Sequence, residues 1–342
     1  MAHKTLQSAK KAKADEFYTQ MNVITDELRH YADKFKGKTI FCNCDDPYES
    51  NFFKYFANNF NVFELKKLIA TCYAGSPIAN TQLSLFADEP PENRTTKAPH
   101  KIVITEVDDY NEDGAANIID VEWLLENKKN ALTRLKGDGD FRSEECVELL
   151  KESDIIVTNP PFSLFREYMA QLFEYDKQFI IIGNKNALTY KEIFAYMAQN
   201  KVRTGYRDIN TDMWFIVPDE YSHEKIVDGQ RVKHIMGTWF TTFEVKKHNQ
   251  NLILTSKYDP QKYPHYDNYD AINVNKYADI PYDWNGEMGV PITFLDKYNP
   301  KQFEILGIDR YIDGNKTPNK RFTINGKEIY ARIIIRRIGD IQ

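Results

Sequence analysis

Residues 154–162, Asp-Ile-Ile-Val-Thr-Asn-Pro-Pro-Phe, constrain the fold of this chain more than any other stretch. The apolar, β-branched run Asp154–Thr158 predicts a buried strand. Pro160 and Pro161 end that strand, because proline has no backbone N–H to donate and fixes φ at about −65°. A proline also favours extended geometry in the residue before it, so Asn159 leaves the strand in a rigid conformation. We therefore expect the Asn159 side chain and the Pro160 carbonyl to point away from the hydrogen-bond ladder of the sheet.

This strand exit suits a reaction at the exocyclic amine of an aromatic base. Such an amine is a weak nucleophile, because its lone pair is delocalised into the ring. The Asn159 side-chain oxygen and the Pro160 carbonyl can each accept one N–H, which draws the amine towards tetrahedral geometry. Phe162 is expected to stack on the base, a contact that contributes about 1–3 kcal/mol. The alternative interpretation is a Pro-Pro turn that only ends a strand.

Asn-Pro-Pro-Phe after a strand resembles the catalytic motif of amino-methyltransferases that use S-adenosylmethionine, in the aromatic form typical of enzymes acting on adenine N6. The segments Cys42–Phe53, Gly237–Thr242 and Met288–Leu295 resemble, in particular, the EcoRI-type adenine-specific modification methylases. The resemblance implies an α/β fold, with a doubly wound class I methyltransferase sheet and a smaller β-rich C-terminal target-recognition region. It also implies that the catalytic residues are Asn159, Pro160, Pro161 and Phe162.

The same resemblance implies S-adenosyl-L-methionine as the cofactor. Asp15–Thr19 resembles the segment that closes over its methionine end, and Gly137–Ser143 resembles the segment that binds its adenine. Cys42–Phe53 replaces the Gly-rich turn of most class I methyltransferases, since this chain has no glycine between Lys38 and Gly75. On residue types alone, Asp45 and Asp46 also fit an Asx turn, and Ser143 a helix cap. The implied cofactor-binding residues are Phe17, Tyr18, Thr19, Asn43, Asp45, Asp46, Pro47, Asp140, Phe141 and Asn159.

The pattern of elements changes near residue 217. Before it, alternating strands and amphipathic helices predict a doubly wound sheet with ligands at the C-terminal ends of its strands. After it come hairpin turns, many tyrosines, and short strands expected at Trp239–Val245 and Leu252–Ser256. We therefore expect an S-adenosylmethionine-binding catalytic domain at 1–217, with an exposed loop at 76–100, and a DNA target-recognition region at 218–342.

The charge of the chain is unevenly distributed. The net charge is −5, yet residues 201–342 carry 21 Lys and Arg against 19 Asp and Glu. Residues 316–337 contain seven basic side chains and one acidic one. Local patches, rather than the total charge, meet phosphates. The predicted DNA-binding residues are Lys316, Lys320, Arg321, Lys327, Arg332, Arg336 and Arg337.

A short apolar motif, Gln82-Leu83-Ser84-Leu85-Phe86, lies inside the polar loop. It resembles the peptide by which bacterial DNA replication and repair proteins dock on the sliding clamp. That resemblance implies clamp contacts by Gln82, Leu83, Leu85 and Phe86. The alternative is a loop that packs Leu83 and Phe86 against its own domain.

The sequence thus predicts a sequence-specific DNA adenine N6-methyltransferase that flips its target adenine out of the duplex, in restriction-modification or epigenetic marking. Its expected partners are double-stranded DNA, the sliding clamp and a cognate restriction endonuclease. We expect a cytoplasmic, nucleoid-associated protein without a metal site, because the chain lacks a signal peptide, a membrane span and zinc-spaced cysteines. The alternatives are an RNA adenine or protein glutamine methyltransferase, or a non-catalytic clamp-associated DNA-binding module.

Overall fold

The computed structural model describes residues 18–44, 50–71, 99–110, 118–127, 132–217, 222–227 and 229–338. The clamp-like segment Gln82–Phe86 lies outside these ranges, as do Phe17, Asp45, Asp46, Pro47 and all but the end of the loop predicted at 76–100. Within the described ranges, every helix is too short or too polar to cross a membrane.

The chain divides into two compact units. Unit 1 comprises Met1–Asn184 and Asp212–Phe240, and unit 2 comprises Lys185–Thr211 and Thr241–Gln342. This division differs from the predicted boundary at residue 217. The reason is strand pairing, because β9 (Met213–Ile216) pairs with β1 (Tyr18–Thr19), which ties residues 212–240 to the N-terminal part of the chain.

The main sheet of unit 1 has a parallel centre. Within unit 1, the strands of this sheet lie in the order β5, β4, β3, β2, β6, β7 and β12. Parallel pairing joins β3 to β2, β2 to β6, and β6 to β7, whereas β4 runs antiparallel to both β3 and β5. The mixed α/β fold predicted from the sequence is confirmed. The bounds are β2 Thr39–Cys42, β3 Lys67–Thr71, β4 His100–Ile104, β5 Leu132–Arg134, β6 Ile155–Thr158, β7 Gln178–Asn184 and β12 Gly237–Thr241.

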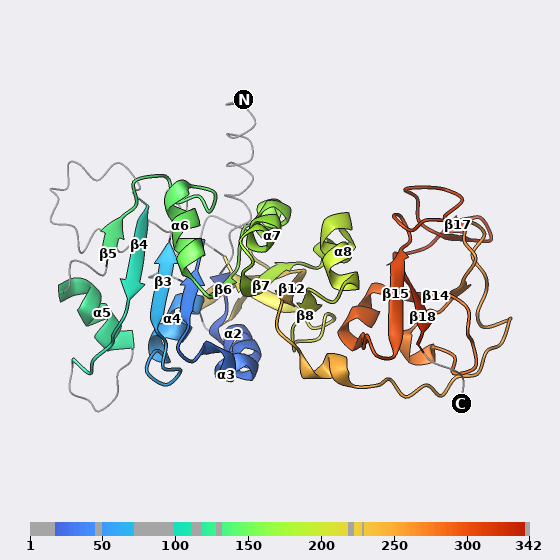
Figure 1. The fold of residues 1–342 in the computed structure, drawn as a ribbon, viewed down its shortest axis with the longest axis horizontal. Helices are drawn as coiled ribbons and strands as arrows, with labels where there is room; N and C mark the ends of the chain where they lie inside the picture. The colour runs from blue at the N-terminus through green and yellow to red at the C-terminus, as the bar shows by residue number, and fades with distance from the viewer. Residues whose placement is uncertain are drawn as a thin grey trace, which may run out of the picture. The chain divides into compact units, whose positions relative to one another are not determined.

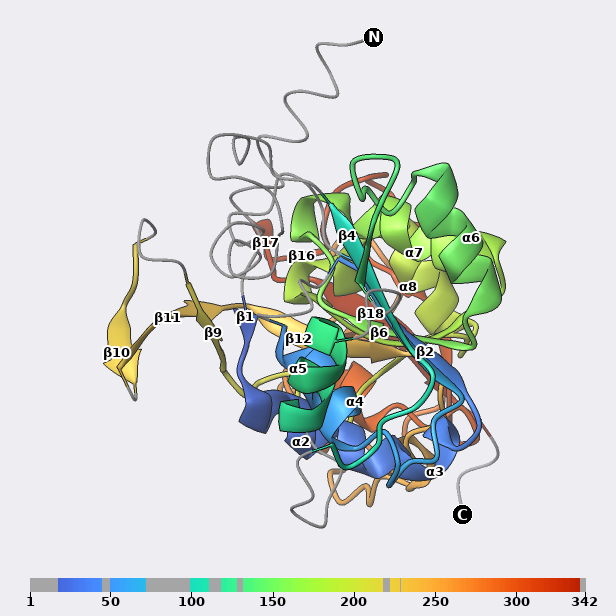
Figure 2. The same cartoon turned by 90° about the vertical axis from the view of Figure 1, so that its left-hand side faces the viewer.

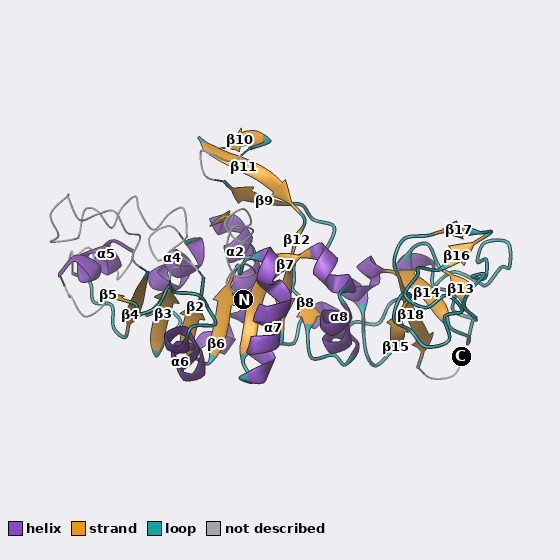
Figure 3. Ribbon diagram, turned by 90° about the horizontal axis from the view of Figure 1, so that it is seen from above, coloured by secondary structure: helices purple, strands orange, loops and turns teal. Residues whose placement is uncertain are grey.

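Helices cover both faces of this sheet. Figure 3 shows α2 (Met21–Leu28), α4 (Asn51–Asn58) and α5 (Ile118–Asn127) on one face, and α6 (Glu144–Glu152) and α7 (Phe165–Glu174) on the other. Every residue of β2 and β6 is buried, as expected for strands covered on both sides. The short helices η1 (Arg29–Tyr31) and α3 (Ala32–Phe35) continue from α2, and η4 (Phe162–Leu164) leads into α7.

A second sheet of unit 1 stands apart from the main one. Its strands lie in the order β1, β9, β11 (Gln230–Ile235) and β10 (Lys225–Val227), and all neighbours are antiparallel. We call β9, β10 and β11 the arm. Figures 2 and 3 both show the arm projecting away from the strands of the main sheet.

Unit 2 is built around a small sheet with the order β13, β14, β18 and β15, and Figure 1 shows its later strands in orange and red. Phe322 anchors a hydrophobic cluster with Tyr266, Ala271 and Ile334. The strands are β8 Arg203–Thr204, β13 Ile272–Asn273, β14 Met288–Pro291, β15 Phe303–Ile308, β16 Thr323–Ile324, β17 Lys327–Glu328 and β18 Arg332–Arg337. The helices are η5 Lys185–Thr189, α8 Lys191–Ala198, η6 Lys246–Asn249, η7 Tyr277–Asp279 and η8 Ile292–Lys297.

Two strand predictions after residue 217 need correction. The strand expected at Trp239–Val245 is β12, which begins two residues earlier and ends at Thr241. Leu252–Ser256 is not a strand, and only Ser256 forms an isolated bridge. There the backbone pairs with a side chain instead, since Leu252 N donates to Gln302 Oε1 at 2.7 Å and Gln302 Nε2 donates to Leu252 O at 2.8 Å.

Candidate active site

Polar residues follow or end the parallel strands of unit 1, and all of them lie at the same edge of the sheet. Asn43 follows β2, Thr71 ends β3, Asn159 follows β6, and Asn184 ends β7. Because these strands are parallel, their C-terminal ends meet at one edge, which is where open α/β sheets bind ligands. We call this group the strand-end edge.

Asn43 is the centre of the hydrogen bonds at the strand-end edge. Its side-chain Oδ1 accepts from the Thr71 hydroxyl at 3.0 Å and from Cys44 N at 3.0 Å. Its backbone carbonyl accepts from the Thr158 hydroxyl, which joins β2 to β6 immediately before Asn159. The side-chain Nδ2 is also buried, and no acceptor contacts it in the part of the chain that the structure describes. Asn43 therefore presents two buried N–H donors beside the Asn-Pro-Pro-Phe motif.

Cys44 takes the backbone conformation that a glycine commonly supplies at this turn. Its φ is 67°, in the left-handed region that non-glycine residues adopt at a cost of about 1–2 kcal/mol. The Asn43 side chain accepts the Cys44 amide and so holds the turn in place. In this chain an Asn-Cys pair therefore forms the turn after β2 without a glycine.

The predicted N-terminal cofactor segment reaches this edge through β1. Thr19 pairs with Phe215 of β9, and its carbonyl accepts from Asn51 Nδ2 at 2.8 Å. Asn51 begins α4, which Ser50 caps by accepting from Phe52 N at 3.1 Å. The Thr19 hydroxyl is buried and contacts no hydrogen-bond partner among the described residues.

The Asn-Pro-Pro-Phe motif forms a stiff corner. Pro160 and Pro161 are buried, and the Pro161 carbonyl accepts from Leu164 N at 3.0 Å to begin η4. None of the hydrogen bonds found among the described residues ends on the Pro160 carbonyl. The Asn159 Oδ1 atom is buried, and Phe162 is half-buried. The Phe162 ring meets the Phe215 ring edge-to-face, with centroids 6.5 Å apart.

In the loop at 137–143, the side chain of Asp140 is held by Arg142. Arg142 Nε donates to Asp140 Oδ1 at 2.8 Å, and Arg142 Nη2 donates to Oδ2 at 2.7 Å. Burial acts to raise the pKa of Asp140, but hydrogen bonds from the Arg142 side chain and backbone, with its charge, outweigh burial and lower that pKa. Asp140 is therefore an ionised acceptor whose position Arg142 fixes.

The neighbouring Phe141 packs inward. It is 3% exposed, and its ring lies edge-to-face with Tyr168 of α7 at 5.0 Å. Two polar contacts fasten the same loop to α7, from Arg142 Nη1 to Glu167 at 2.8 Å and from Gln171 Nε2 to the Phe141 carbonyl at 3.1 Å. Since α7 begins just after Phe162, one helix fixes both the 137–143 loop and the Asn-Pro-Pro-Phe motif.

A family model described as "Adenine-specific methyltransferase EcoRI" matches residues 5–338. The chain belongs to this family. It is therefore an adenine-specific, site-specific DNA methyltransferase, which confirms the function predicted from the sequence. Methyltransferases of this kind use S-adenosylmethionine in general.

Three curated relatives cover nearly the whole methyltransferase. Type II methyltransferase M.EcoRI of Escherichia coli is 45% identical, over 98% of this chain and 96% of the relative. Type II methyltransferase M.MgeORF184P of Mycoplasma genitalium is 36% identical, over 96% of this chain and 97% of the relative. Type II methyltransferase M.MpnI of Mycoplasma pneumoniae is 34% identical, over 96% and 97% respectively. No solved structure gives a significant match.

The seven basic residues predicted to bind DNA differ in their surroundings. Lys316, Lys320 and Lys327 are exposed and form no side-chain ion pair with any residue in the described ranges. Arg332 is 8% exposed, and its Nε donates to Asn273 Oδ1 at 3.0 Å. The other three also have protein partners: Arg321 pairs with Asp309 at 3.3 Å, Arg336 pairs with Glu304 at 3.2 Å, and Arg337 donates to the Tyr282 carbonyl.

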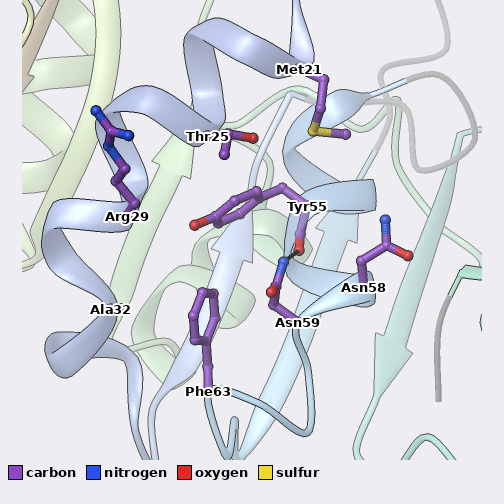
Figure 4. A pocket seen from close by; sticks show the side chains of 8 residues that line it. All are labelled: Met21, Thr25, Arg29, Ala32, Tyr55, Asn58, Asn59 and Phe63. Carbon is purple, nitrogen blue, oxygen red and sulfur yellow. Dashed lines mark hydrogen bonds between the residues drawn. The ribbon is translucent and has the colours of Figure 1, made fainter. Parts of the chain in front are cut away.

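A cavity of about 430 Å³ lies beside α2 and α4 (Figure 4). Figure 4 shows the Tyr55 ring at its centre, with the Tyr55 carbonyl accepting from Asn59 Nδ2 at 2.8 Å. Burial raises the pKa of Tyr55 to about 12. The residues that line the cavity are Met21, Thr25, Arg29, Ala32, Tyr55, Asn58, Asn59 and Phe63.

Sequence reasoning missed Thr71, Asn51 and Phe215, which support the site from three separate elements. Thr71 holds Asn43, Asn51 holds Thr19, and Phe215 contacts Phe162. A signal existed for Thr71, because it is the polar residue that ends an apolar parallel strand. No local pattern marks Phe215, which reaches the site only through pairing with a strand almost 200 positions earlier.

Proposed function

We propose that this methyltransferase transfers the methyl group of S-adenosylmethionine to N6 of an adenine that is flipped out of duplex DNA at Asn159–Phe162. The observation that carries the proposal is the strand-end edge. There, the stiff catalytic corner, the Asn43 donors and the β1 segment are joined by direct hydrogen bonds and ring contacts. Flipping is required because the amine of a stacked adenine cannot be reached inside the duplex.

In this proposal the catalytic corner binds the target amine. Asn159 Oδ1 accepts one N–H and the Pro160 carbonyl accepts the other, which aims the nitrogen lone pair at the methyl group. Pro160 and Pro161 hold both oxygens in place before the base arrives. Phe162, whose ring contacts the ring of Phe215, provides a face on which the base stacks. The nitrogen loses a proton only after the new N–C bond has formed, so positioning replaces a strong base.

The residues around Asn43 fit the cofactor. S-adenosylmethionine, when bound, supplies an electrophilic methyl group on a sulfonium. The buried Asn43 Nδ2 and Thr19 hydroxyl lack partners among the described residues, so they suit the carboxylate and hydroxyl groups of such a molecule. Tyr18 is the other residue of β1. The ionised Asp140 suits the adenine amine of the cofactor, and Phe141 supports the loop of Asp140 by packing against Tyr168. Phe17, Asp45, Asp46 and Pro47, outside the described residues, complete the proposed set.

Unit 2 is proposed to read the DNA. Lys316, Lys320 and Lys327 are the residues best suited to phosphates, because they are exposed and are not neutralised by an acid in the described structure. Arg321, Arg336 and Arg337 require exchange of their present partners before they contact DNA, whereas Arg332 supports the sheet from inside. Residues 218–240 of the predicted recognition region belong to unit 1 in this proposal.

The test is transfer of a tritiated methyl group to purified DNA, RNA and protein fractions, followed by nucleoside analysis of the labelled DNA. Label as N6-methyladenine in DNA is expected. Label in RNA adenine or protein glutamine would overturn the choice of substrate, and failure to bind S-adenosylmethionine would favour a non-catalytic module. Long-read sequencing of DNA from cells expressing the gene then gives the recognition site.

Two partner proposals rest on sequence resemblance and on the type II names of the relatives. A peptide of residues 80–88 should bind purified sliding clamp if Gln82, Leu83, Leu85 and Phe86 form a docking motif. A restriction endonuclease partner should cleave DNA that lacks the modification and spare DNA that carries it. Absence of clamp binding removes the first proposal without affecting the catalytic one.

A further inference from the structure

The two faces of the arm can be assigned from its strand register. Lys233 of β11 is the direct partner of Phe215 of β9, and Phe215 is the partner of Thr19 of β1. Directly paired residues share one face of a sheet, and so do residues two positions apart along a strand. Arg231 therefore shares this face, together with its partner Ile226 of β10. We call it the inner face of the arm.

The inner face runs from the catalytic corner out to solvent. At its base Phe215 is fully buried, Thr19 is 4% exposed, and the Phe215 ring meets that of Phe162. Lys233 and Arg231 are half-buried, and Ile226 at the outer strand is 63% exposed. A large apolar side chain thus lies open to solvent beside two cations, on a surface continuous with the site of the target base.

The charges on the arm suit a polyanion. The described residues of β10 and β11 include Lys225, Arg231 and Lys233 and contain no Asp or Glu. On the opposite face, Lys225 is already engaged, because its Nζ lies 3.5 Å from the centroid of the Trp214 ring. On the inner face, Lys233 Nζ donates to the Ser222 hydroxyl at 3.3 Å, a neutral partner. Among the residues that the structure describes, which include Glu224 just before β10, no acid forms an ion pair with Lys233.

We propose that the inner face of the arm binds the duplex DNA that flanks the flipped adenine. Lys233 and Arg231 contact phosphates, and Ile226 packs against the sugar and base edges of a groove. This inference rests on the proposed function, and it adds a contact surface in unit 1 to the recognition residues of unit 2. The continuity from Phe162 through Phe215 to Lys233 is the reason for choosing flanking DNA as the occupant.

The experiment compares Lys233→Ala with Lys225→Ala in the full chain. Binding of a fluorescein-labelled mixed-sequence duplex is measured by anisotropy over a range of salt concentrations. Lys233→Ala should weaken binding roughly three- to tenfold and lower the slope of log K against log salt by about 0.9, the value for one lost phosphate contact. Lys225→Ala removes the same charge from the opposite face and should keep the wild-type slope. Lys233→Arg should restore it.

Kinetics separate a DNA contact from a structural role. Lys233→Ala should raise KM for DNA and leave kcat and S-adenosylmethionine affinity at wild-type values. An unchanged salt slope in Lys233→Ala, or equal losses in both alanine variants, would overturn the inference. Failure of the proposed function would look different, because the wild-type protein itself would then leave adenine unmethylated.

Discussion

Two buried asparagines, one in each unit, make opposite use of the same side chain. Asn268 in unit 2 is 5% exposed, and its Nδ2 lies within hydrogen-bond reach of Asn315 Oδ1, Thr317 Oγ1 and Arg321 O. Its Oδ1 accepts from Thr323 N at 3.0 Å. Asn43 in unit 1 is fully buried, and its side-chain Oδ1 is paired. Its side-chain Nδ2, however, meets no acceptor within the described structure.

We propose that this difference distinguishes an asparagine that stabilises the fold, Asn268, from one that binds the cofactor, Asn43. An unpaired buried amide costs about 1–3 kcal/mol, so a protein retains one only where something else provides the partner or the function. The side chain of Asn268 is saturated by its own chain and fixes the loop that carries Lys316 and Lys320. In the proposed function, Asn43 keeps its donors for the cofactor. We expect substitutions at the two positions to change different measured quantities.

The largest expected effect is at Asn159, which belongs to the same strand-end edge as Asn43. Asn159→Ala removes one of the two oxygens proposed to hold the target amine, so kcat should fall roughly 10²–10³-fold, as for the loss of one positioned polar group in an active site. Single-turnover methyl transfer measures the change, and calorimetry should show that the variant still binds S-adenosylmethionine. Asn268→Ala is the matched control and should keep kcat per folded molecule. A fully active Asn159→Ala enzyme would remove Asn159 from the mechanism.

The sequence predicted the helices and strands of unit 1 where a local signal marks their ends. Ser143 caps α6 at the expected position, and the strand predicted at Asp154–Thr158 is β6, one residue shorter at its start. The antiparallel direction of β4 was not predictable, because its Ile-Val-Ile run resembles the apolar runs of the parallel strands. The left-handed Cys44 has no signature in residue type either, since glycine is the residue expected there.

The candidate site was predictable as a set of strand ends but not as a set of contacts. Asn43 and Asn159 lie at one edge because the C-terminal ends of parallel strands lie at the same edge of a sheet. This rule can be applied to strands predicted from the sequence alone. The burial of Phe141 against Tyr168 and the place of Phe215 depend on packing between distant segments. The predicted boundary at residue 217 differs from the division into units for the same reason, because β1 and β9 pair across most of unit 1.

The second expected effect concerns pH and lies in unit 2, where buried polar groups serve stability. The His248 ring bridges the Tyr298 carbonyl at 3.1 Å and the Thr204 hydroxyl at 3.3 Å. Burial, aided by the charge of Lys247, lowers the pKa of His248 to about 4. The unfolded chain binds this proton at about pH 6.5, so stability is fully present above that pH and falls by up to about 3 kcal/mol as pH drops towards 4.

Urea unfolding from about pH 7 to about pH 5 measures this loss. Asp296, which accepts from Thr204 and Lys247 at 3.0 Å, acts in the opposite direction, because burial raises the pKa of its carboxyl. The control is therefore His248→Asn, which removes the titrating ring and leaves Asp296 in place. The variant should lose less stability than the wild type over this range. Parallel curves for the two proteins would show that His248 does not titrate as its burial implies.

The smallest expected effect tests whether Asn43 and Asn268 serve different purposes. Asn43→Ala and Asn268→Ala should each destabilise the fold by about 1–3 kcal/mol, because each leaves buried groups without a partner. Only Asn43→Ala should also weaken S-adenosylmethionine binding, by about tenfold, which corresponds to one hydrogen bond of about 1.4 kcal/mol. Calorimetry on both folded variants measures the affinities. If Asn43→Ala binds the cofactor as tightly as Asn268→Ala does, then Asn43 serves only the fold, and its spare donors do not mark the cofactor site.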